Sequence, residues 1–339
     1  MEIGEQVSEL IRGQAASWTN ALERAEPLPA GVRYLLVGSG SSYYVALAAA
    51  AVARRLGVQA DALPAADLCL EPDVALAEVD QVVVISRSGA TSEALWATSN
   101  AKRRGRRVLA LTADPASELA QSADVTAASS AWDDPTVVMI RSFTGFLVYL
   151  QAAIARTIAD PTSLDEVRMI PEGFEAAYRA GRTLVDAIGT DEPERIVILG
   201  GGVRWGVALE GMLKLTEMAH VAVTAYNPLE FRHGPRGALS PDDLVVLLGQ
   251  TAFADAEGRV LEDIAGQTQR LAVIAAPAWF EQSQARVTRC ELPQHPGDMW
   301  AGPLATVPLQ LLAWHMALMR GHDPDHPANL GKVVRLPRG

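Results

Sequence analysis

Two short segments rich in serine and glycine each join an apolar run to a helical pattern. They are Gly38-Ser39-Gly40-Ser41-Ser42 and Ser86-Arg87-Ser88-Gly89-Ala90-Thr91. Free backbone N–H groups and the helix dipole at such a junction favour an anion, and glycine lets the backbone come close to it. Serine and glycine also cap helices and form turns without any ligand. Because the pattern follows two strands, it favours a phosphate site, whereas the lack of a third glycine argues against a dinucleotide site.

Three charged residues share one face of a further predicted helix, over 205–219. Glu210, Lys214 and Glu217 have the spacing i, i+4 and i+7, which also fits a salt-bridge ladder in solvent. The opposite face is apolar and should pack firmly, through Ala208, Leu209, Met212 and Leu213. If the charged face lines a cleft, Glu217 can carry a proton, and Lys214 can keep it ionised or bind an anion.

A single histidine, His233, lies in segment 226–235, which has proline near both ends and little periodicity. We expect an ordered loop there. The Gly-Pro pair that follows restricts the backbone, so the ring should be presented rather than buried. A lone histidine is often structural, but it also suits acid–base chemistry near neutral pH.

The elements that position these residues alternate between strands and helices. After an N-terminal helix over 3–25, we predict strands over 34–37, 82–85 and 108–111, with helices over 43–56 and 92–103. Such alternation indicates a parallel sheet covered by helices on both faces.

The pattern then restarts, with strands over 195–199, 221–225, 244–248 and 271–274. Segment 34–40 matches 196–202, and 45–47 matches 207–209 at the same offset. We interpret this as an internal duplication of a doubly wound α/β unit, joined by a helical segment over 161–182.

The composition excludes several classes of protein. The chain has 339 residues, enough for two domains, and its formal charge of −11 is opposite in sign to that of a general nucleic-acid binder. No segment is long and apolar enough to span a membrane, and the acidic N-terminus does not have the order of a signal peptide. Neither Cys69 nor Cys290 has a cysteine or histidine at the spacing usual for zinc ligands. We therefore expect a cytoplasmic protein without a metal.

Five blocks of sequence resemble the sugar isomerase (SIS) domain family, present twice over residues 30–339. They are 85–93, 208–217, 230–235, 306–313 and 329–332. The chain is similar to the isomerase half of the glutamine–fructose-6-phosphate aminotransferases (glucosamine-6-phosphate synthases) and to shorter relatives. The resemblance implies two tandem flavodoxin-like α/β domains. We expect an N-terminal helix over 1–29, SIS domains over 30–165 and 191–339, and a connecting helix over 166–190.

The resemblance also implies a role for each matching residue. The sugar phosphate would be bound by the two serine turns, through Gly40, Ser41, Ser42, Ser86, Arg87, Ser88 and Thr91. Glu217 would move a proton between C1 and C2 of the sugar, with Lys214 beside it.

Three further roles come from the resemblance. His233 would open the sugar ring in the site of the neighbouring subunit of a homodimer, Lys332 would lie near the sugar carbonyl, and Glu230 would hold the His233 loop.

Two departures from the aminotransferases narrow the expected activity. Residue 2 is Glu2, where their glutaminase domain has a nucleophilic cysteine, and Met139 stands where they have a sugar-contacting serine. We expect a phosphosugar isomerase of the glucosamine-6-phosphate deaminase type, which releases ammonia and fructose 6-phosphate and needs no cofactor. The alternatives are an ammonia-dependent synthase-like aminotransferase, fed by a separate glutaminase, a fructosamine-6-phosphate deglycase, and a non-catalytic sugar-phosphate sensor. Arg204, Met139 and the Glu230 loop would shape the choice of sugar.

Overall fold

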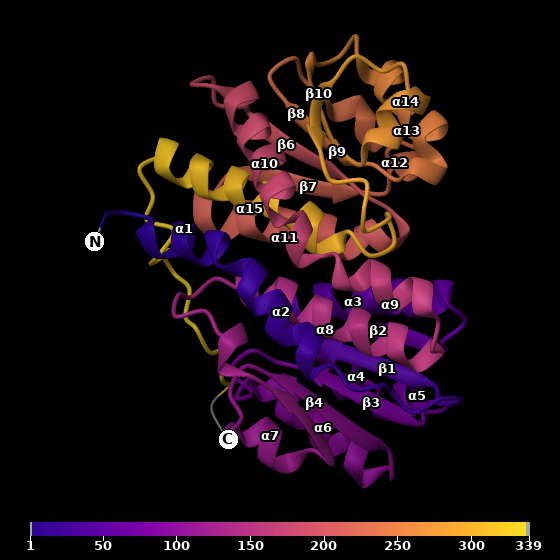
Figure 1. Ribbon diagram of the computed structural model, residues 1–339. Coiled ribbons are helices and arrows are strands. Elements are labelled where there is room, and N and C mark those ends of the chain that lie inside the picture. Colours follow the sequence, from indigo (N-terminus) through magenta and orange to yellow (C-terminus); the bar gives the residue numbers. More distant parts are fainter. Residues whose placement is uncertain (1, 337–339) are drawn as a thin grey trace. The chain divides into compact units, whose positions relative to one another are not determined.

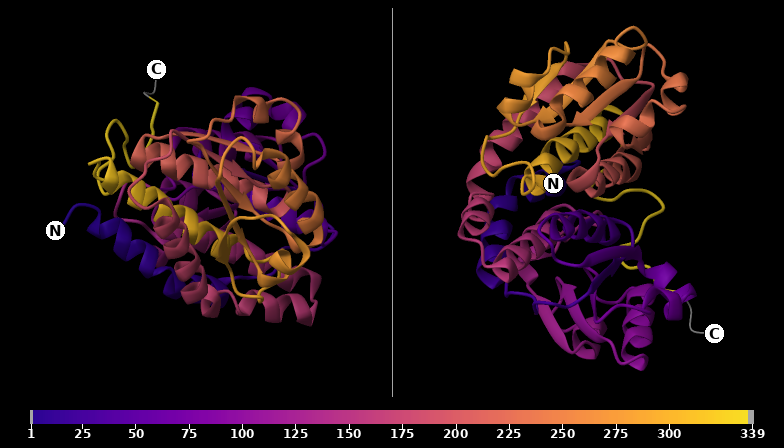
Figure 2. Two further views of the ribbon diagram at one scale, coloured as in Figure 1. Left: turned by 90° about the horizontal axis from the view of Figure 1, so that it is seen from above. Right: turned by 90° about the vertical axis from the view of Figure 1, so that its right-hand side faces the viewer.

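The computed structural model describes residues 2–336, which form two compact units, each built on one five-stranded parallel sheet (Figure 1). The β1–β5 unit comprises residues 16–168 and the chain from residue 328 onward. The β6–β10 unit comprises the chain up to residue 15 and residues 169–327. The last segment of the chain, yellow in Figure 2, therefore leaves the β6–β10 unit and belongs to the β1–β5 unit.

The first sheet has the strand order β2-β1-β3-β4-β5. Its strands are β1 (Tyr34–Gly38), β2 (Ala60–Pro64), β3 (Gln81–Ile85), β4 (Arg107–Thr112) and β5 (Val125–Ala128). The helices of this part of the chain are α2 (Gln14–Arg24), α3 (Ser41–Arg55), α4 (Ala65–Leu70), α5 (Pro72–Ala75), α6 (Ser92–Arg103), α7 (Glu118–Ser122), α8 (Arg141–Ile158) and α9 (Pro161–Arg168), with a 3₁₀ turn at Ser130–Trp132.

The second sheet has the order β10-β9-β8-β6-β7. Its strands are β6 (Arg195–Leu199), β7 (Ala222–Tyr226), β8 (Leu244–Leu248), β9 (Arg270–Ala275) and β10 (Thr288–Glu291). The helices of this unit are α1 (Glu5–Arg12), α10 (Phe174–Ile188), α11 (Trp205–Lys214), α12 (Pro228–Phe231), α13 (Ala254–Ile264), α14 (Pro277–Gln282) and α15 (Gly302–Met319), with 3₁₀ turns at Pro171–Gly173, Gly202–Arg204, Pro235–Ala238 and Thr251–Phe253.

The two sheets have the same topology. In each, the first strand of the repeat lies between the second and the third, followed by the fourth and the fifth, and all pairings are parallel. This is the flavodoxin-like order of a doubly wound fold. It confirms the predicted fold class and the internal duplication.

Burial explains for most strands whether the sequence could predict them. Every residue of β1, β3 and β8 is buried, as expected of central strands covered on both faces, and these segments are continuous apolar runs. The edge strands β2, β5 and β10 are partly exposed and more polar, and the sequence did not predict them. The remaining edge strand, β7, is also partly exposed, but the sequence did predict it.

The N-terminal segment differs from the single predicted helix. It forms α1 and α2, separated at Gly13, and α1 contacts α15 within the β6–β10 unit. Helix α15 is almost entirely apolar and packs against α10 and α11, so it forms much of the core of this unit. None of the helices in the described residues is long and apolar enough to cross a bilayer.

Candidate functional site

The two serine turns lie side by side at one edge of the first sheet. The first follows β1 and the second follows β3, and these strands are hydrogen-bonded neighbours. The chain continues outward to β2 on one side and to β4 on the other, so the strand order reverses between the turns. Open α/β sheets bind ligands at this reversal point, outside the carboxyl ends of the strands.

The first turn is tight and relies on glycine. Gly40 has a φ of 55°, in the region that favours glycine. A Cβ atom at Gly38 would lie 2.5 Å from the backbone carbonyl carbon of Ser42, so a larger residue cannot fit there. Ser41 and Ser42 begin α3, and the Ser42 hydroxyl lies 3.8 Å from the sulfur of Met139.

The second turn brings hydroxyl groups together. The Ser86 and Thr91 hydroxyl oxygens are 3.5 Å apart, and Ser88 Oγ accepts a hydrogen bond from the backbone N–H two residues on. Gly89 has a φ of 58°, and a Cβ atom there would lie 2.1 Å from Ser117 Oγ. Thr91 precedes α6, but its hydroxyl pairs with Ser86 rather than capping the helix.

Arg87 turns away from this row of hydroxyls. Its side chain is buried, with 6% of its surface exposed, and its guanidinium donates to four backbone carbonyls. The acceptors are the oxygens of Thr136, Val137, Val138 and Lys332, at 3.2, 2.8, 3.2 and 3.2 Å. Where the resemblance implies a substrate contact, the guanidinium is engaged with the protein's own backbone.

Residues 332–336 form a C-terminal strap that lies against the second turn and α6. Ser92 N–H donates to the Val334 carbonyl at 3.4 Å, and Leu336 N–H donates to Ser92 Oγ at 2.9 Å. Lys332 Nζ lies 3.1 Å from Asp133 Oδ2, with both side chains partly exposed. The predicted site residue Lys332 therefore belongs to the same unit as the serine turns.

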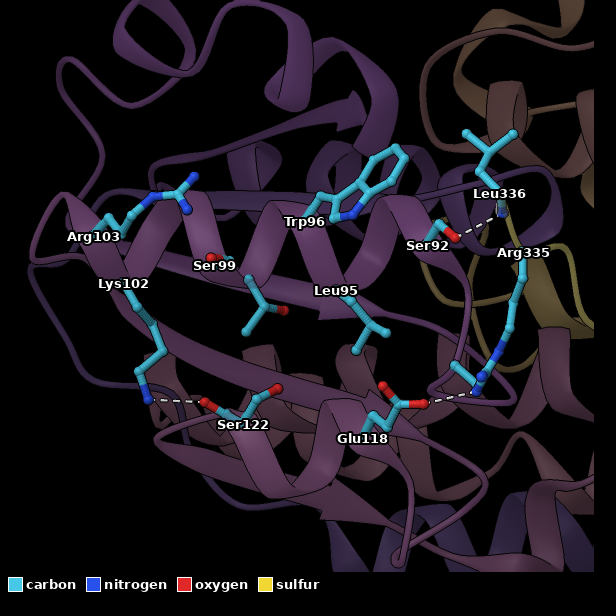
Figure 3. Close-up of a pocket in the computed structure, with 12 residues that line it drawn as sticks. Ser92, Leu95, Trp96, Ser99, Lys102, Arg103, Glu118, Ser122, Arg335 and Leu336 are labelled. Atoms are coloured by element: carbon cyan, nitrogen blue, oxygen red, sulfur yellow. Dashed lines mark hydrogen bonds and ion pairs between the residues drawn. The ribbon is translucent and has the colours of Figure 1, made fainter. Parts of the chain in front are cut away.

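An open groove of about 980 Å³ adjoins the strap (Figure 3). It runs along α6 past the exposed Trp96. Ion pairing between Arg335 Nη2 and Glu118 Oε1, at 2.8 Å, closes one end, and Lys102 Nζ donates to the Ser122 carbonyl at 2.8 Å.

The β6–β10 unit holds the predicted charged cluster. Lys214, at the end of α11, forms ion pairs with Glu210 Oε1 at 3.5 Å and with Glu217 Oε2. The side chains of Glu210 and Lys214 are 0% and 1% exposed, while that of Glu217 is 20% exposed. The cluster is therefore not a ladder in solvent, and Glu217 is its more accessible member.

The backbone under Glu217 is not an α-helix. After α11 the chain continues as a π-helical turn, Leu215–Ala219, which ends at His220 with a φ of 50°. The predicted helix over 205–219 is correct in extent, but its last turn is wider than we expected. Single π turns inside helices are frequent at functional sites.

His233 lies on the surface of the same unit, as its neighbouring Gly-Pro pair predicts. The residue is exposed, and its N–H donates to the Glu230 carbonyl at 2.9 Å. The segment contains the short helix α12, capped by Asn227, whose side chain accepts from the Leu229 N–H at 3.0 Å. Glu230 is also exposed, so the segment is ordered and presents both side chains to solvent.

Comparison with known families decides the assignment. Residues 30–156 and 191–276 match the SIS domain. The chain belongs to the SIS domain family. The first matched segment contains β1–β5 and the second contains β6–β9, and the expected resemblance is confirmed.

Curated relatives of the chain include glutamine–fructose-6-phosphate aminotransferases [isomerizing]. The Pyrobaculum aerophilum protein is 28% identical over 99% of this SIS chain and 57% of its own length. The Pseudomonas aeruginosa protein is 30% identical over 75% of this chain and 43% of its own. The chain thus spans about half the length of the curated relatives it matches.

Solved structures match over nearly their whole length. Glucosamine-6-phosphate deaminase from Thermotoga maritima is 26% identical, covers 98% of this chain and 99% of its own, and has a TM-score of 0.80. The C-terminal domain of glucosamine-fructose-6-phosphate aminotransferase from Francisella tularensis, at 22% identity, has a TM-score of 0.83 and covers 95% and 98%. The SIS protein described here is therefore related to phosphosugar isomerases and to the isomerase part of these aminotransferases.

The sequence did not predict a buried polar cluster at the carboxyl edge of the second SIS sheet. Arg204 is fully buried, and its Nη2 lies 3.5 Å from Asp298 Oδ1. Glu257 accepts hydrogen bonds from Gln250 N–H at 2.9 Å and from Trp279 Nε1 at 2.7 Å. Burial raises the pKa of Glu257 to about 7 and lowers that of Arg204.

The alignment of the two repeats could have indicated this cluster. In the match of the two halves, Arg204 takes the place of Ser42, the serine of the first turn. The first repeat therefore has hydroxyls at the position where the second repeat has a buried charge.

Proposed function

We propose that this SIS protein is an enzyme that isomerises an amino-sugar phosphate and releases ammonia, in the manner of a glucosamine-6-phosphate deaminase. The buried Glu210–Lys214–Glu217 cluster carries the proposal. Its outer carboxylate is held by a buried ammonium and still reaches solvent. A sensor needs hydroxyls that bind phosphate, but it does not need a fixed proton carrier. The match to the deaminase from Thermotoga maritima over 98% of the chain supports the same reaction.

In the proposed reaction, the serine turns bind the phosphate through hydroxyl and backbone N–H groups. His233, supplied by the neighbouring subunit of a homodimer, transfers the proton that opens the ring. Glu217 removes the proton from C2 to form an enolamine and returns a proton to C1. Water then adds to the resulting imine at C2, and the C–N bond breaks to give fructose 6-phosphate and ammonia. Lys332 polarises the sugar carbonyl.

The direct test incubates the protein with glucosamine 6-phosphate and measures ammonia and fructose 6-phosphate. We expect equal amounts of both, and a loss of turnover on the order of 100-fold or more in Glu217→Gln, since a positioned acid–base group contributes about that much. Glu23→Gln, an exposed glutamate on α2, is the matched control and should retain full activity. The deaminase proposal fails if wild type forms neither product.

Met139 gives a specific reason to test a second substrate. Its sulfur, rather than a hydroxyl, faces Ser42 in the first turn, and a thioether sulfur is only a weak hydrogen-bond acceptor and cannot donate. The same assay should therefore include a fructosamine 6-phosphate and, in reverse, fructose 6-phosphate with ammonia. Turnover of one of these alone would assign a deglycase or a synthase-like activity. Binding of sugar phosphate without any turnover would favour a sensor.

A further inference from the structure

The buried guanidinium of Arg87 joins three separate parts of the β1–β5 unit. Arg87 itself belongs to the second serine turn. Its Nη1 donates to Thr136 and Val138, and its Nη2 donates to Val137 and Lys332. Residues 136–138 precede α8, and Lys332 lies 245 positions away in the C-terminal strap.

The number of donors on a guanidinium limits what else Arg87 can do. Of its five N–H donors, four belong to the two Nη atoms. Those atoms make four contacts with carbonyl oxygens. To bind a phosphate in the turns, Arg87 would have to release backbone acceptors, of which those of Thr136 and Val138 are buried, and leaving these without a donor is costly.

Each part held by Arg87 carries a group of the proposed site. The second turn has Ser86 and Ser88, residues 136–138 lead directly to Met139 beside Ser42, and the strap has Lys332. Asp133, the ion-pair partner of Lys332, lies just before the same 136–138 segment. A movement of the guanidinium would therefore shift groups on both turns and on the strap.

We propose that Arg87 is a positioning residue, which sets the relative placement of the second serine turn, the segment before α8 and the strap that bears Lys332. The part of this proposal that concerns turnover rests on the proposed function. The part that concerns docking of the strap does not.

Lysine at this position separates positioning from direct anion binding. Lys keeps the positive charge but has one compact ammonium, which cannot reach carbonyls on several segments as the planar guanidinium does. If Arg87 positions the site, Arg87→Lys should be nearly as impaired as Arg87→Met. If Arg87 binds phosphate by charge, Arg87→Lys should retain most of the affinity for substrate.

The first experiment measures hydrogen exchange of the strap in the free enzyme. In wild type, the Leu336 amide should exchange slowly, because it is bonded to Ser92 Oγ. In Arg87→Met and Arg87→Lys the strap amides should exchange faster, whereas Lys332→Ala keeps the carbonyl that Arg87 holds and should leave them protected. Arg103→Met, an exposed arginine on α6, is the matched control. A Leu336 amide that exchanges freely in wild type overturns the proposal even if both Arg87 variants fail to fold.

The second experiment separates kcat from KM with glucosamine 6-phosphate. A misplaced site should lower kcat/KM on the order of 100-fold in both variants. A fall in Arg87→Met that Arg87→Lys restores, with the strap protected in both, would assign Arg87 to phosphate binding and overturn the positioning role. If wild type turns over no sugar phosphate, only the proposed function fails, and the exchange result still decides whether Arg87 holds the strap.

Discussion

At the scale of single residues, the unusual feature is the charged cluster of Glu210, Lys214 and Glu217 on consecutive helical turns. Two of its members, Glu210 and Lys214, are buried. Such a cluster is held by mutual attraction rather than by solvent, and the loss of one member leaves another without compensation. Lys214 is the common partner of Glu210 and Glu217.

Removing the shared ammonium should therefore destabilise the fold. We expect Lys214→Met to lower the free energy of unfolding by roughly 3–5 kcal/mol, because it leaves Glu210 buried without its cation. The double variant Lys214→Met with Glu210→Leu removes both charges and should recover much of that loss. Urea unfolding measures both. A single variant within about 1 kcal/mol of wild type would contradict the buried pairing.

Glu257 gives a prediction for pH. Burial raises its pKa from 4.5 to about 7, so the folded state binds its proton more tightly than the unfolded state. Stability then falls as the pH rises through this interval. Relative to Glu257→Gln, the wild-type free energy of unfolding should fall by about 3 kcal/mol between pH 4.5 and about 7, and then stay level. Urea unfolding over this range tests it, and a constant difference between the two proteins would contradict the shift.

At the scale of elements, Gly89 in the second serine turn and Gly105 just after α6 show how glycine permits a close approach. Gly89 and Gly105 both have positive φ, of 58° and 70°. A Cβ atom at Gly105 meets nothing within 4 Å, whereas one at Gly89 would collide with Ser117.

This pair provides a matched comparison. Gly105→Ala should lower the free energy of unfolding only by the cost of placing alanine at a positive φ, about 1–2 kcal/mol. Gly89→Ala has the same backbone cost, and its Cβ atom also collides with Ser117. It should therefore be less stable than Gly105→Ala and should also bind sugar phosphate more weakly. Thermal unfolding and KM measure the two effects. Equal losses in both variants would mean that Ser117 moves aside without disturbing the turn.

The elements also show what the sequence could predict. Central strands such as β8 are continuous apolar runs, so their limits follow from composition alone. Edge strands such as β5 are half-exposed and paired on one side, and their formation depends on the neighbouring strand rather than on their own pattern. The π turn under Glu217 was not predictable, because a helical repeat of apolar residues does not distinguish a local widening. The resemblance to the family supplied candidate roles, but the burial of Arg87 could not be predicted from the sequence. An arginine in a serine-rich turn fits phosphate binding as well as it fits contacts with the protein's own backbone.

At the scale of the whole molecule, duplication produced two sheets with one topology and different chemistry at their carboxyl edges. The first has hydroxyls, and the second has the buried cluster around Arg204. Two copies of the same fold therefore need not have the same binding groups at the carboxyl ends of their strands.

The proposed homodimer can be tested by mixing variants. Glu217→Gln and His233→Asn should each be inactive alone. If His233 serves the neighbouring subunit, a mixed dimer has one site with both residues intact, so random re-association should restore about a quarter of wild-type activity. Ammonia release after co-refolding measures this, with each variant refolded separately as the control. No recovery in verified mixed dimers would place His233 and Glu217 of one chain in the same site.

The return of the strap to the first unit has a consequence for how the chain is made. Arg87 donates to the carbonyl of Lys332, so the hydrogen bonds of this guanidinium are completed by a residue 245 positions later in the chain. During synthesis on the ribosome, the first repeat emerges early, but its buried guanidinium lacks one acceptor until the whole second repeat has been made. A chain that stopped between α15 and Lys332 would therefore include every strand of both sheets and still lack the strap and the acceptor that Arg87 needs.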